Sequence, residues 1–513
     1  MGERHVLVGA KIENVDDLYI DGQWRGASSG RTRAVIDPAD GSVITEVAEA
    51  DPADVRAAIV AARRAFDDSP WRSTTVAERS DLLRRVAELL QRDRESLAET
   101  ETRDTGKTLE ESRIDVDDVT AVFRYYADLV TTVADRVVDV GDPAVVSRVV
   151  REPVGVCVMI APWNYPLLQI SWKVAPALAA GATMVLKPSE VTPLTTIAFV
   201  RLLVEAGVPS GVANLVLGAG RDLSDALNDD PDVDLISFTG GLATGQVIAA
   251  TAAKHVTRVL VELGGKNPHV VFADACGTEE QFAATVDQVV TGVFLHSGQV
   301  CSAGTRLIVE ESVADRLVAA VAARAESIVV GPGTDPASRT GPLVSQQQLE
   351  KIVDHVASGL AEGASLVTGG RRLDDPERDD PRLADGYFYA PTVFDHCDRT
   401  MRIVQDETFG PILTVERFTT EAQALELAND THYGLAGGVR TADPARAERI
   451  ARGMRHGTVW INDFGYYTPA AEWGGYGRSG NGRELGPSGL AEYQETKHIW
   501  NNTAAPTAGW FES

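Results

Sequence analysis

Apolar residues recur along the chain at two spacings, and these spacings predict its elements. Within residues 15–50, "DLYIDGQWRG" places Asp-Gly between two short alternating runs, which is typical of a β-hairpin, and "SVITEVAEA" alternates again. From Asp51 to about Thr105 the apolar positions lie three and four residues apart, as in "DPADVRAAIVAARRAF". Asp51 and the proline after it form a candidate helix start, so this part predicts amphipathic helices.

Strand-like and helix-like segments alternate after Val140. "VSRVVREPVGVCVMIAPWN" predicts two strands, and a second alternating region runs from about Asn267 to Ile461. "GLAEYQETKHIWNN" predicts a terminal strand, and the charged, proline-containing residues 369–387 predict a surface loop. Alternation of this kind is typical of stacked βαβ units, so we expect an α/β fold with a mainly parallel sheet.

Composition narrows the classes of function. The 513 residues, 44% hydrophobic and 24% charged, suffice for two or three domains. A net charge of −26 argues against nucleic acid and anionic membrane surfaces as partners. The stretch "MGERHVLVGAKIENVDDLYIDGQW" has no signal-peptide pattern, and no apolar run is long enough to span a bilayer. We therefore expect a cytoplasmic protein without a membrane partner.

The four cysteines, Cys157, Cys276, Cys301 and Cys397, lie far apart and form no C-x-x-C pair. A cytoplasmic chain keeps its thiols reduced, so we expect neither a disulfide nor a metal site. Cys301, in "FLHSGQVCSAGTRLIVEES", is then either a packing thiol or a reactive one.

Two polar residues are candidates for catalysis. Glu262 ends a predicted strand before two glycines in "VLVELGGKNP", where a carboxylate that points into a cleft is suited to act as a general base. Taken alone, a glutamate in this position is more often an ordinary surface or salt-bridged acid. Asn164, in "APWNYPLL", offers a neutral donor to an oxyanion, although an Asn beside proline often bonds its own backbone in a turn.

Other residues suit a nucleotide. Lys187 and Glu190, in "VLKPSEVTP", lie at the end of another predicted strand and suit sugar hydroxyls. The alternative is a helix N-cap box, in which Ser189 or Glu190 simply starts the next helix. Gly240 and Gly245, in "FTGGLATG", precede a predicted helix whose free N–H groups suit a pyrophosphate, although a plain turn has the same pattern.

Together and in this order, these stretches resemble the aldehyde dehydrogenase superfamily from "LYIDGQW" to "EYQETKH", with "ELGGKNP" and "GQVCSAGTR" as the more specific matches. The resemblance implies that Cys301 attacks an aldehyde, and that the Asn164 side chain and the Cys301 backbone N–H hold the oxyanion. It further implies that hydride passes to NAD and that Glu262 activates the water that hydrolyses the thioester.

The resemblance also implies a fold and a cofactor site. We expect a Rossmann-like NAD-binding domain (1–140 and 156–265), an α/β catalytic domain (266–463) and a β-flap with the C-terminal segment (141–155 and 464–513) that forms a homodimer or homotetramer. Glu190 would disfavour a 2′-phosphate, and Gly241 stands where many relatives have a Ser. The implied cofactor residues are Ile160, Trp163, Lys187, Glu190, Gly220, Phe238, Gly240, Gly241, Gly245, Leu263, Glu407 and Phe409.

Within the superfamily, "REPVGVCVMIAPWNYPLLQISWKVAPALAAG" and "GTVWINDF" resemble bacterial betaine aldehyde dehydrogenases. Quaternary ammonium groups are recognised over aromatic faces. Tyr165 and Trp172, seven residues apart on one predicted helix, and Trp473 are therefore candidate substrate residues, with Tyr466 and Tyr467 as possible additions. Core packing is the alternative for these aromatic residues.

Other functions stay open beside betaine aldehyde oxidation. The alternative substrates are ω-aminoaldehydes and uncharged aliphatic aldehydes. Glu472 and Asn481 depart from the pattern of relatives near the expected substrate region. Two further alternatives belong to other classes of protein. One is a non-catalytic ligand-binding protein of this fold, and the other is a thioester hydrolase that works without NAD.

Overall fold

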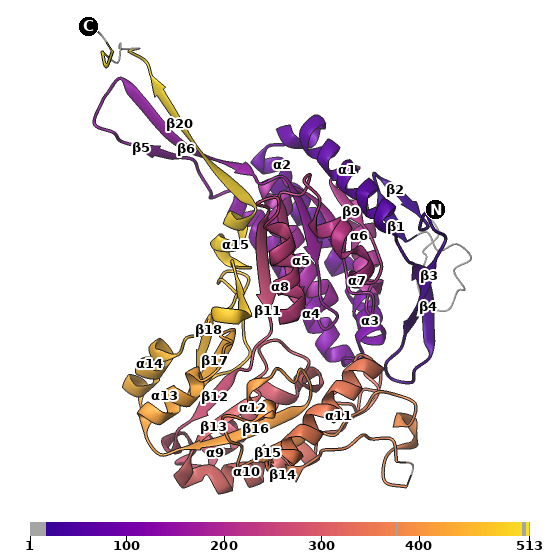
Figure 1. Cartoon of the computed structure of the whole chain (residues 1–513), viewed down its shortest axis with the longest axis vertical. Coiled ribbons are helices and arrows are strands. Elements are labelled where there is room, and N and C mark those ends of the chain that lie inside the picture. Colours follow the sequence, from indigo (N-terminus) through magenta and orange to yellow (C-terminus); the bar gives the residue numbers. More distant parts are fainter. Residues whose placement is uncertain (1–16, 376, 505–508, 512–513) are drawn as a thin grey trace.

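The structure is a computed structural model that describes residues 17–375, 377–504 and 509–511. Two lobes, each built on one sheet with helices around it, lie one above the other, and a thin third sheet projects from the upper lobe as an arm (Figure 1). The prediction of an α/β fold with mainly parallel sheets is confirmed. Predictions that fall on residues 1–16 lie outside the described part of the chain.

The first lobe is built on an eight-stranded sheet. Its central strands pair in parallel, and antiparallel strands lie at both edges. In spatial order the strands are β19 (Gly480–Asn481), β11 (Arg258–Leu263), β10 (Leu235–Gly240), β7 (Val156–Ile160), β8 (Thr183–Lys187), β9 (Ala213–Leu215), β1 (Leu18–Ile20) and β2 (Gln23–Arg25). The helices of this lobe are α1 (Pro52–Asp68), α2 (Val76–Arg92), α3 (Arg94–Thr105), α4 (Leu109–Val130), α5 (Pro166–Ala180), α6 (Leu194–Ala206), α7 (Gly220–Asn228) and α8 (Leu242–Ala252). A separate hairpin joins β3 (Thr32–Ile36) to β4 (Val43–Ala48).

The second lobe is built on a seven-stranded sheet that is parallel except for the edge strand β14. Its order is β14 (Ser365–Thr368), β15 (Thr392–Asp395), β16 (Ile412–Phe418), β13 (Arg306–Glu310), β12 (Pro268–Val271), β17 (Ala436–Arg440) and β18 (Thr458–Ile461). Its helices are α9 (Glu279–Phe294), α10 (Glu311–Glu326), α11 (Gln346–Ala361), α12 (Arg402–Gln405), α13 (Glu421–Asn429) and α14 (Pro444–Gly453).

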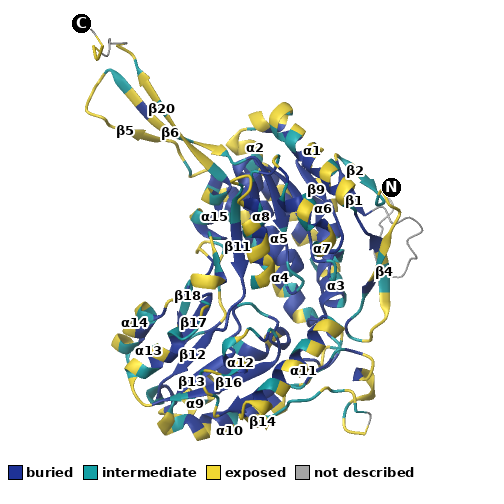
Figure 2. Cartoon of the chain, viewed as in Figure 1, coloured by how far each residue is buried: buried dark blue, intermediate teal, exposed yellow. Residues whose placement is uncertain are grey.

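The arm consists of β5 (Arg136–Val138), β6 (Val145–Pro153) and β20 (Gln494–Asn502), joined in antiparallel fashion. Most of its surface is exposed, in contrast to the buried strands of both lobes (Figure 2). The predicted terminal strand is only partly right, because Gly489–Glu492 belong to helix α15 (Gly486–Glu492) and the strand begins at Gln494. The roles assigned to the predicted domains stay predictions.

Two local predictions are confirmed. Asp51 is the N-cap of α1, and its side chain accepts hydrogen bonds from the backbone N–H groups of Ala53 and Asp54. Asp21 and Gly22, with φ of 54° and 84°, form the turn between β1 and β2, and only residues that tolerate positive φ fit such a turn.

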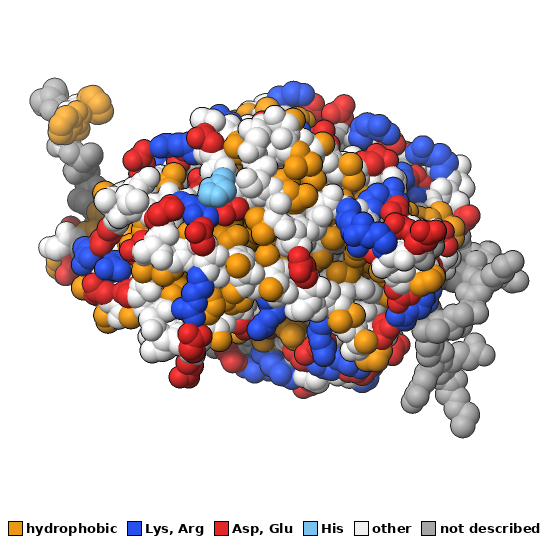
Figure 3. Space-filling model, turned by 90° about the horizontal axis from the view of Figure 1, so that it is seen from below, with side chains coloured by type: hydrophobic (Ala, Val, Ile, Leu, Met, Phe, Trp, Pro, Cys, Tyr) orange, Lys and Arg blue, Asp and Glu red, His pale blue; other side chains and the backbone are white. Residues whose placement is uncertain are grey.

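The molecular surface is mixed in character. On the face seen in Figure 3, acidic, basic and apolar side chains are interspersed rather than gathered by type. No helix of the described residues is long and apolar enough to cross a membrane.

Candidate active site

A cavity of about 160 Å³ brings residues of the two lobes together. Residues of the first lobe come from the carboxyl ends of β7, β10 and β11 and from the segments that follow them, the edge at which open parallel sheets bind ligands. The lining residues are Pro162, Trp163, Asn164, Gln169, Thr239, Gly240, Gly241, Glu262, Gly264, Cys301, Gln348, Lys351, Glu407 and Phe409.

Cys301 faces this cavity from the loop before β13. The Asn267 side chain fixes the loop by donating to the carbonyl oxygens of Cys301 and Ala303, at 2.9 and 3.0 Å. Burial, followed by the charges of Glu262 and Glu407, raises the pKa of the Cys301 thiol well above its usual value. The thiol is therefore protonated at rest and needs a base before it can react.

Glu262 lies one residue before the end of β11 and is only 4% exposed. Burial and the neighbouring Glu484 raise its pKa to about 8, while Lys173 and a hydrogen bond from Trp473 act in the opposite direction. The alternative of a surface or salt-bridged acid is wrong, because the carboxylate is buried and, among the described residues, forms no ion pair.

Asn164 is also buried, and its side-chain amide donates to the Gln299 carbonyl oxygen at 2.8 Å. Gln299 lies two residues before Cys301, so Asn164 is bound to the loop that carries the thiol. The alternative of an Asn that bonds its own turn is therefore wrong.

Lys187 ends β8, and its ammonium lies 3.2 Å from the Glu190 carboxylate. The next helix, α6, begins only at Leu194, with Pro193 as its N-cap, so the alternative that Ser189 or Glu190 starts a helix is wrong. A Cβ at Gly220, the first residue of α7, would lie 3.7 Å from the Lys187 nitrogen. These groups thus form one small polar region.

Glycines shape the segment between β10 and α8. A Cβ at Gly240 would lie 2.5 Å from the ring of Phe238, and one at Gly245 would lie 2.6 Å from Leu263. Gly241 is the N-cap of α8 and provides no side-chain hydrogen bond, which leaves backbone N–H groups of the first turn available. Gly245 lies inside α8 rather than before it.

Two further candidate cofactor residues line the cavity from the second lobe. The Gly265 backbone N–H donates to Glu407 at 3.1 Å, and the rings of Trp163 and Phe409 lie with centroids 5.1 Å apart. Ile160, the last residue of β7, lies four positions before Asn164.

Trp172 and Trp473 lie in one aromatic cluster with Tyr467, with ring centroids 5.2 to 6.2 Å apart. The Tyr467 hydroxyl donates to the Asp118 carboxylate at 2.5 Å. Tyr165 is the N-cap of α5 rather than a residue within it, so helical spacing does not orient its ring. Its ring lies against His296 and under the Lys107 ammonium, 3.9 Å from the centroid.

Lys173, Glu484 and Thr239 were not predicted as part of this site. Lys173 forms an ion pair with Glu484 and donates to Thr239 at 2.7 Å. A sequence signal existed for Lys173, because it is the one charged residue of the otherwise apolar "PLLQISWKVAPALAA" and a buried charge needs a partner.

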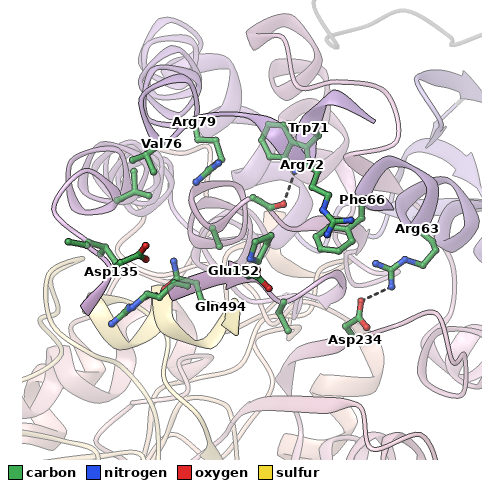
Figure 4. A pocket seen from close by; sticks show the side chains of 18 residues that line it. Arg63, Phe66, Trp71, Arg72, Val76, Arg79, Asp135, Glu152, Asp234 and Gln494 are labelled. Carbon is green, nitrogen blue, oxygen red and sulfur yellow. Dashed lines mark hydrogen bonds and ion pairs between the residues drawn. The ribbon is translucent and has the colours of Figure 1, made fainter. Parts of the chain in front are cut away.

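A larger cavity lies elsewhere. It measures about 560 Å³ at the base of the arm, where Arg72, Arg79 and Gln494 surround it, and Arg63 forms an ion pair with Asp234 at 2.9 Å on its wall (Figure 4). None of the candidate residues lines it, so the chemistry rather than the size of a cavity identifies the candidate site.

Known proteins resemble the chain over nearly its whole length. The model of the aldehyde dehydrogenase family matches residues 24–499. Betaine aldehyde dehydrogenase of Bacillus subtilis (strain 168) is 51% identical over 97% of this chain and 99% of its own. Peroxisomal aminoaldehyde dehydrogenase 1 of Pisum sativum is 40% identical over 96% of this chain and 97% of its own. A crystal structure of Staphylococcus aureus betaine aldehyde dehydrogenase in complex with NAD⁺ superposes with a TM-score of 0.94, at 46% identity, over 98% of both chains.

Proposed function

Because the chain belongs to the aldehyde dehydrogenase family, we propose that it oxidises betaine aldehyde to glycine betaine. It has the fold of that family and is an NAD-dependent aldehyde dehydrogenase. The residue roles and the choice of aldehyde are the proposed part.

Cys301 is the proposed nucleophile. Glu262, with a pKa of about 8, is partly ionised near neutral pH and is suited to remove the thiol proton, directly or through water. The sulfur then bonds to the aldehyde carbon, and the aldehyde oxygen becomes an oxyanion. The Asn164 amide and the Cys301 backbone N–H are the proposed donors to that oxyanion.

Release of hydride from this tetrahedral centre leaves a thioester on Cys301. NAD, when bound, supplies the hydride acceptor. Glu262 first passes the thiol proton to solvent and then takes a proton from the water that attacks the thioester carbon. The C–S bond breaks, the acid product leaves as its carboxylate with release of a proton, and the Cys301 thiolate regains its proton from Glu262.

The residues of the first lobe fit NAD. The uncapped first turn of α8 offers backbone N–H groups to a pyrophosphate. Lys187 and Glu190 offer an ammonium and a carboxylate to ribose hydroxyls, and the Glu190 charge opposes a 2′-phosphate, which supports NAD over NADP.

The cluster of Trp172, Tyr467 and Trp473 is the observation that carries the choice of aldehyde. Aromatic rings of this kind suit a cation that cannot donate hydrogen bonds, and the Asp118 carboxylate bonded to Tyr467 adds negative potential. A relative named for betaine aldehyde is 51% identical, which supports the same substrate. An ω-aminoaldehyde is the second candidate, supported by the pea relative.

The test compares betaine aldehyde with 3,3-dimethylbutanal, which has the same shape but carries a carbon in place of the nitrogen. We expect kcat/KM to favour the cation by about 5- to 30-fold, since a desolvated cation–π contact contributes about 1–2 kcal/mol. Trp172→Ala should reduce the rate on the cation more than that on the neutral aldehyde. Equal loss on both substrates would contradict the proposal, and a preference for 4-aminobutyraldehyde would favour the second candidate.

We also propose that the chain acts in the cytoplasm as a homodimer or homotetramer joined through the arm. Exposed apolar residues there, Val137 at 71% and Trp500 at 55%, support an arm that another subunit covers.

A further inference from the structure

One residue of the aromatic cluster also contacts the proposed base. The Trp473 indole N–H donates to Oε1 of Glu262 at 3.3 Å, and both groups are buried. The other oxygen, Oε2, has no hydrogen-bond partner in the described part of the chain. Trp473 thus bonds one carboxylate oxygen and leaves the second one available at the cavity that Glu262 lines.

The indole is held in place by its own backbone. Trp473 and Glu484 exchange two backbone hydrogen bonds, at 2.7 and 2.8 Å. The Glu484 side chain is paired with Lys173, which donates to Thr239, the residue opposite Glu262 in the β10–β11 ladder. A closed set of contacts therefore fixes the indole and Glu262 relative to each other.

Trp172 differs from Trp473 in this one respect. Both rings are buried in the same cluster, with centroids 6.0 Å apart. Within the described residues, the Trp172 indole nitrogen has no hydrogen-bond partner. The two tryptophans are therefore a matched pair, of which only Trp473 can act on the base through its N–H.

We propose that Trp473 is a positioning residue for the reaction: its indole N–H orients Glu262 and favours the ionised, base-competent form of the carboxylate. This inference rests on the proposed function, in which Glu262 removes protons. Trp473 would then have two roles, because its ring belongs to the cluster proposed to bind the cation and its N–H donates to the base. Under the proposed function, a bound cation would therefore contact Trp473, the residue that orients Glu262.

The direction in which Trp473 shifts the pKa of Glu262 follows from the negative charge of the carboxylate to which its N–H is bonded. A donor to a carboxylate stabilises the anion, and Trp473 lowers the pKa of Glu262 in this way. Loss of the N–H should raise the pKa of Glu262 further above its usual range. A smaller fraction of the enzyme then carries an ionised base at pH 7, and activity recovers as the pH rises.

The experiment compares Trp473→Phe with Trp172→Phe, each of which keeps an aromatic ring. We expect Trp473→Phe to move the rising limb of the kcat–pH profile up by about one unit, which is up to tenfold slower turnover at pH 7 and a smaller deficit at high pH. Trp172→Phe should leave the midpoint of that limb unchanged. Superimposable profiles of the two variants, with wild-type activity intact, would overturn the inference, whereas absence of NADH formation by the wild type would instead overturn the proposed function.

A second replacement guards against a packing effect. Benzothienylalanine at position 473 keeps the shape of tryptophan and has sulfur in place of the N–H. It should reproduce the pH shift of Trp473→Phe with an unchanged unfolding temperature. If it behaves as the wild type, the indole N–H plays no part and the inference fails.

Discussion

At the scale of single residues, burial is the main cause of the raised pKa of Glu262, and the charge of Glu484 adds to it. Glu484 is a cause of the raised pKa of Glu262, and Lys173 opposes it. Glu484→Gln removes a like charge and leaves the Lys173 ammonium less neutralised, so both changes lower the pKa of Glu262. We expect the rising limb of the kcat–pH profile to move to lower pH, the opposite of the change expected for Trp473→Phe.

The matched control is Glu472→Gln. Glu472 is an exposed carboxylate of the same C-terminal region and accepts hydrogen bonds from Ser488, at the start of α15. Its charge is not among the causes that shift Glu262. If the rising limb of the kcat–pH profile moved equally in Glu484→Gln and Glu472→Gln, the overall charge, rather than the buried charge of Glu484, would determine its midpoint.

The sequence predicted the reacting residues better than it predicted their surroundings. Cys301, Glu262 and Asn164 line one cavity, as their motifs indicated. The Lys173–Glu484 pair was not predicted, because it joins residues 311 positions apart and only the folded chain brings them together. The position of Tyr165 was also misjudged, since a periodic pattern does not locate the first residue of a helix.

At the scale of elements, a buried ion pair joins the neighbouring strands β13 and β16. Arg306 donates to Glu416 through two nitrogens at 2.7 and 3.0 Å, and both side chains are almost fully buried. Arg306→Met leaves a buried carboxylate without its partner. We expect a loss of about 3–5 kcal/mol in the free energy of unfolding, measured by urea denaturation.

Two comparisons make this prediction specific. The double variant Arg306→Met/Glu416→Leu removes both charges and should recover much of the lost stability. Arg452→Met breaks a solvent-exposed pair with Glu448 and should change stability little. If Arg306→Met is as mild as Arg452→Met, the buried pair contributes far less than its geometry suggests.

Helices and strands with a strong periodicity of apolar residues were predictable from the sequence, whereas the boundaries between them were not. The alternation after Val140 gave the parallel strands of both lobes, and Asp51 gave the start of α1. The C-terminal segment was harder, because "GLAEY" is short and mostly apolar and fits a strand as well as the helix to which most of it belongs.

At the scale of the whole molecule, the arm exposes apolar side chains to solvent. Trp500→Asp places a charge on its exposed apolar surface. If another subunit covers this surface, desolvation of that charge should weaken assembly. We expect light scattering after size exclusion to show a smaller species than the wild type.

Leu360→Asp, at a position that is 50% exposed on α11 of the second lobe, is the control and should keep the wild-type mass. Unchanged mass for Trp500→Asp would remove the arm surface from the proposed interface.

The position of the two chain ends has a practical consequence. Strand β20 runs to the outer end of the arm, whereas β1 lies in the first lobe, well away from the arm (Figure 1). Trp510 and Phe511, which follow β20 in the chain, are 84% and 96% exposed. If another subunit covers the arm, as proposed, an affinity tag or a surface anchor fused beyond the arm would weaken that contact. Attachment on the side of β1, away from the arm, is then the better choice for immobilised enzyme and for biosensors.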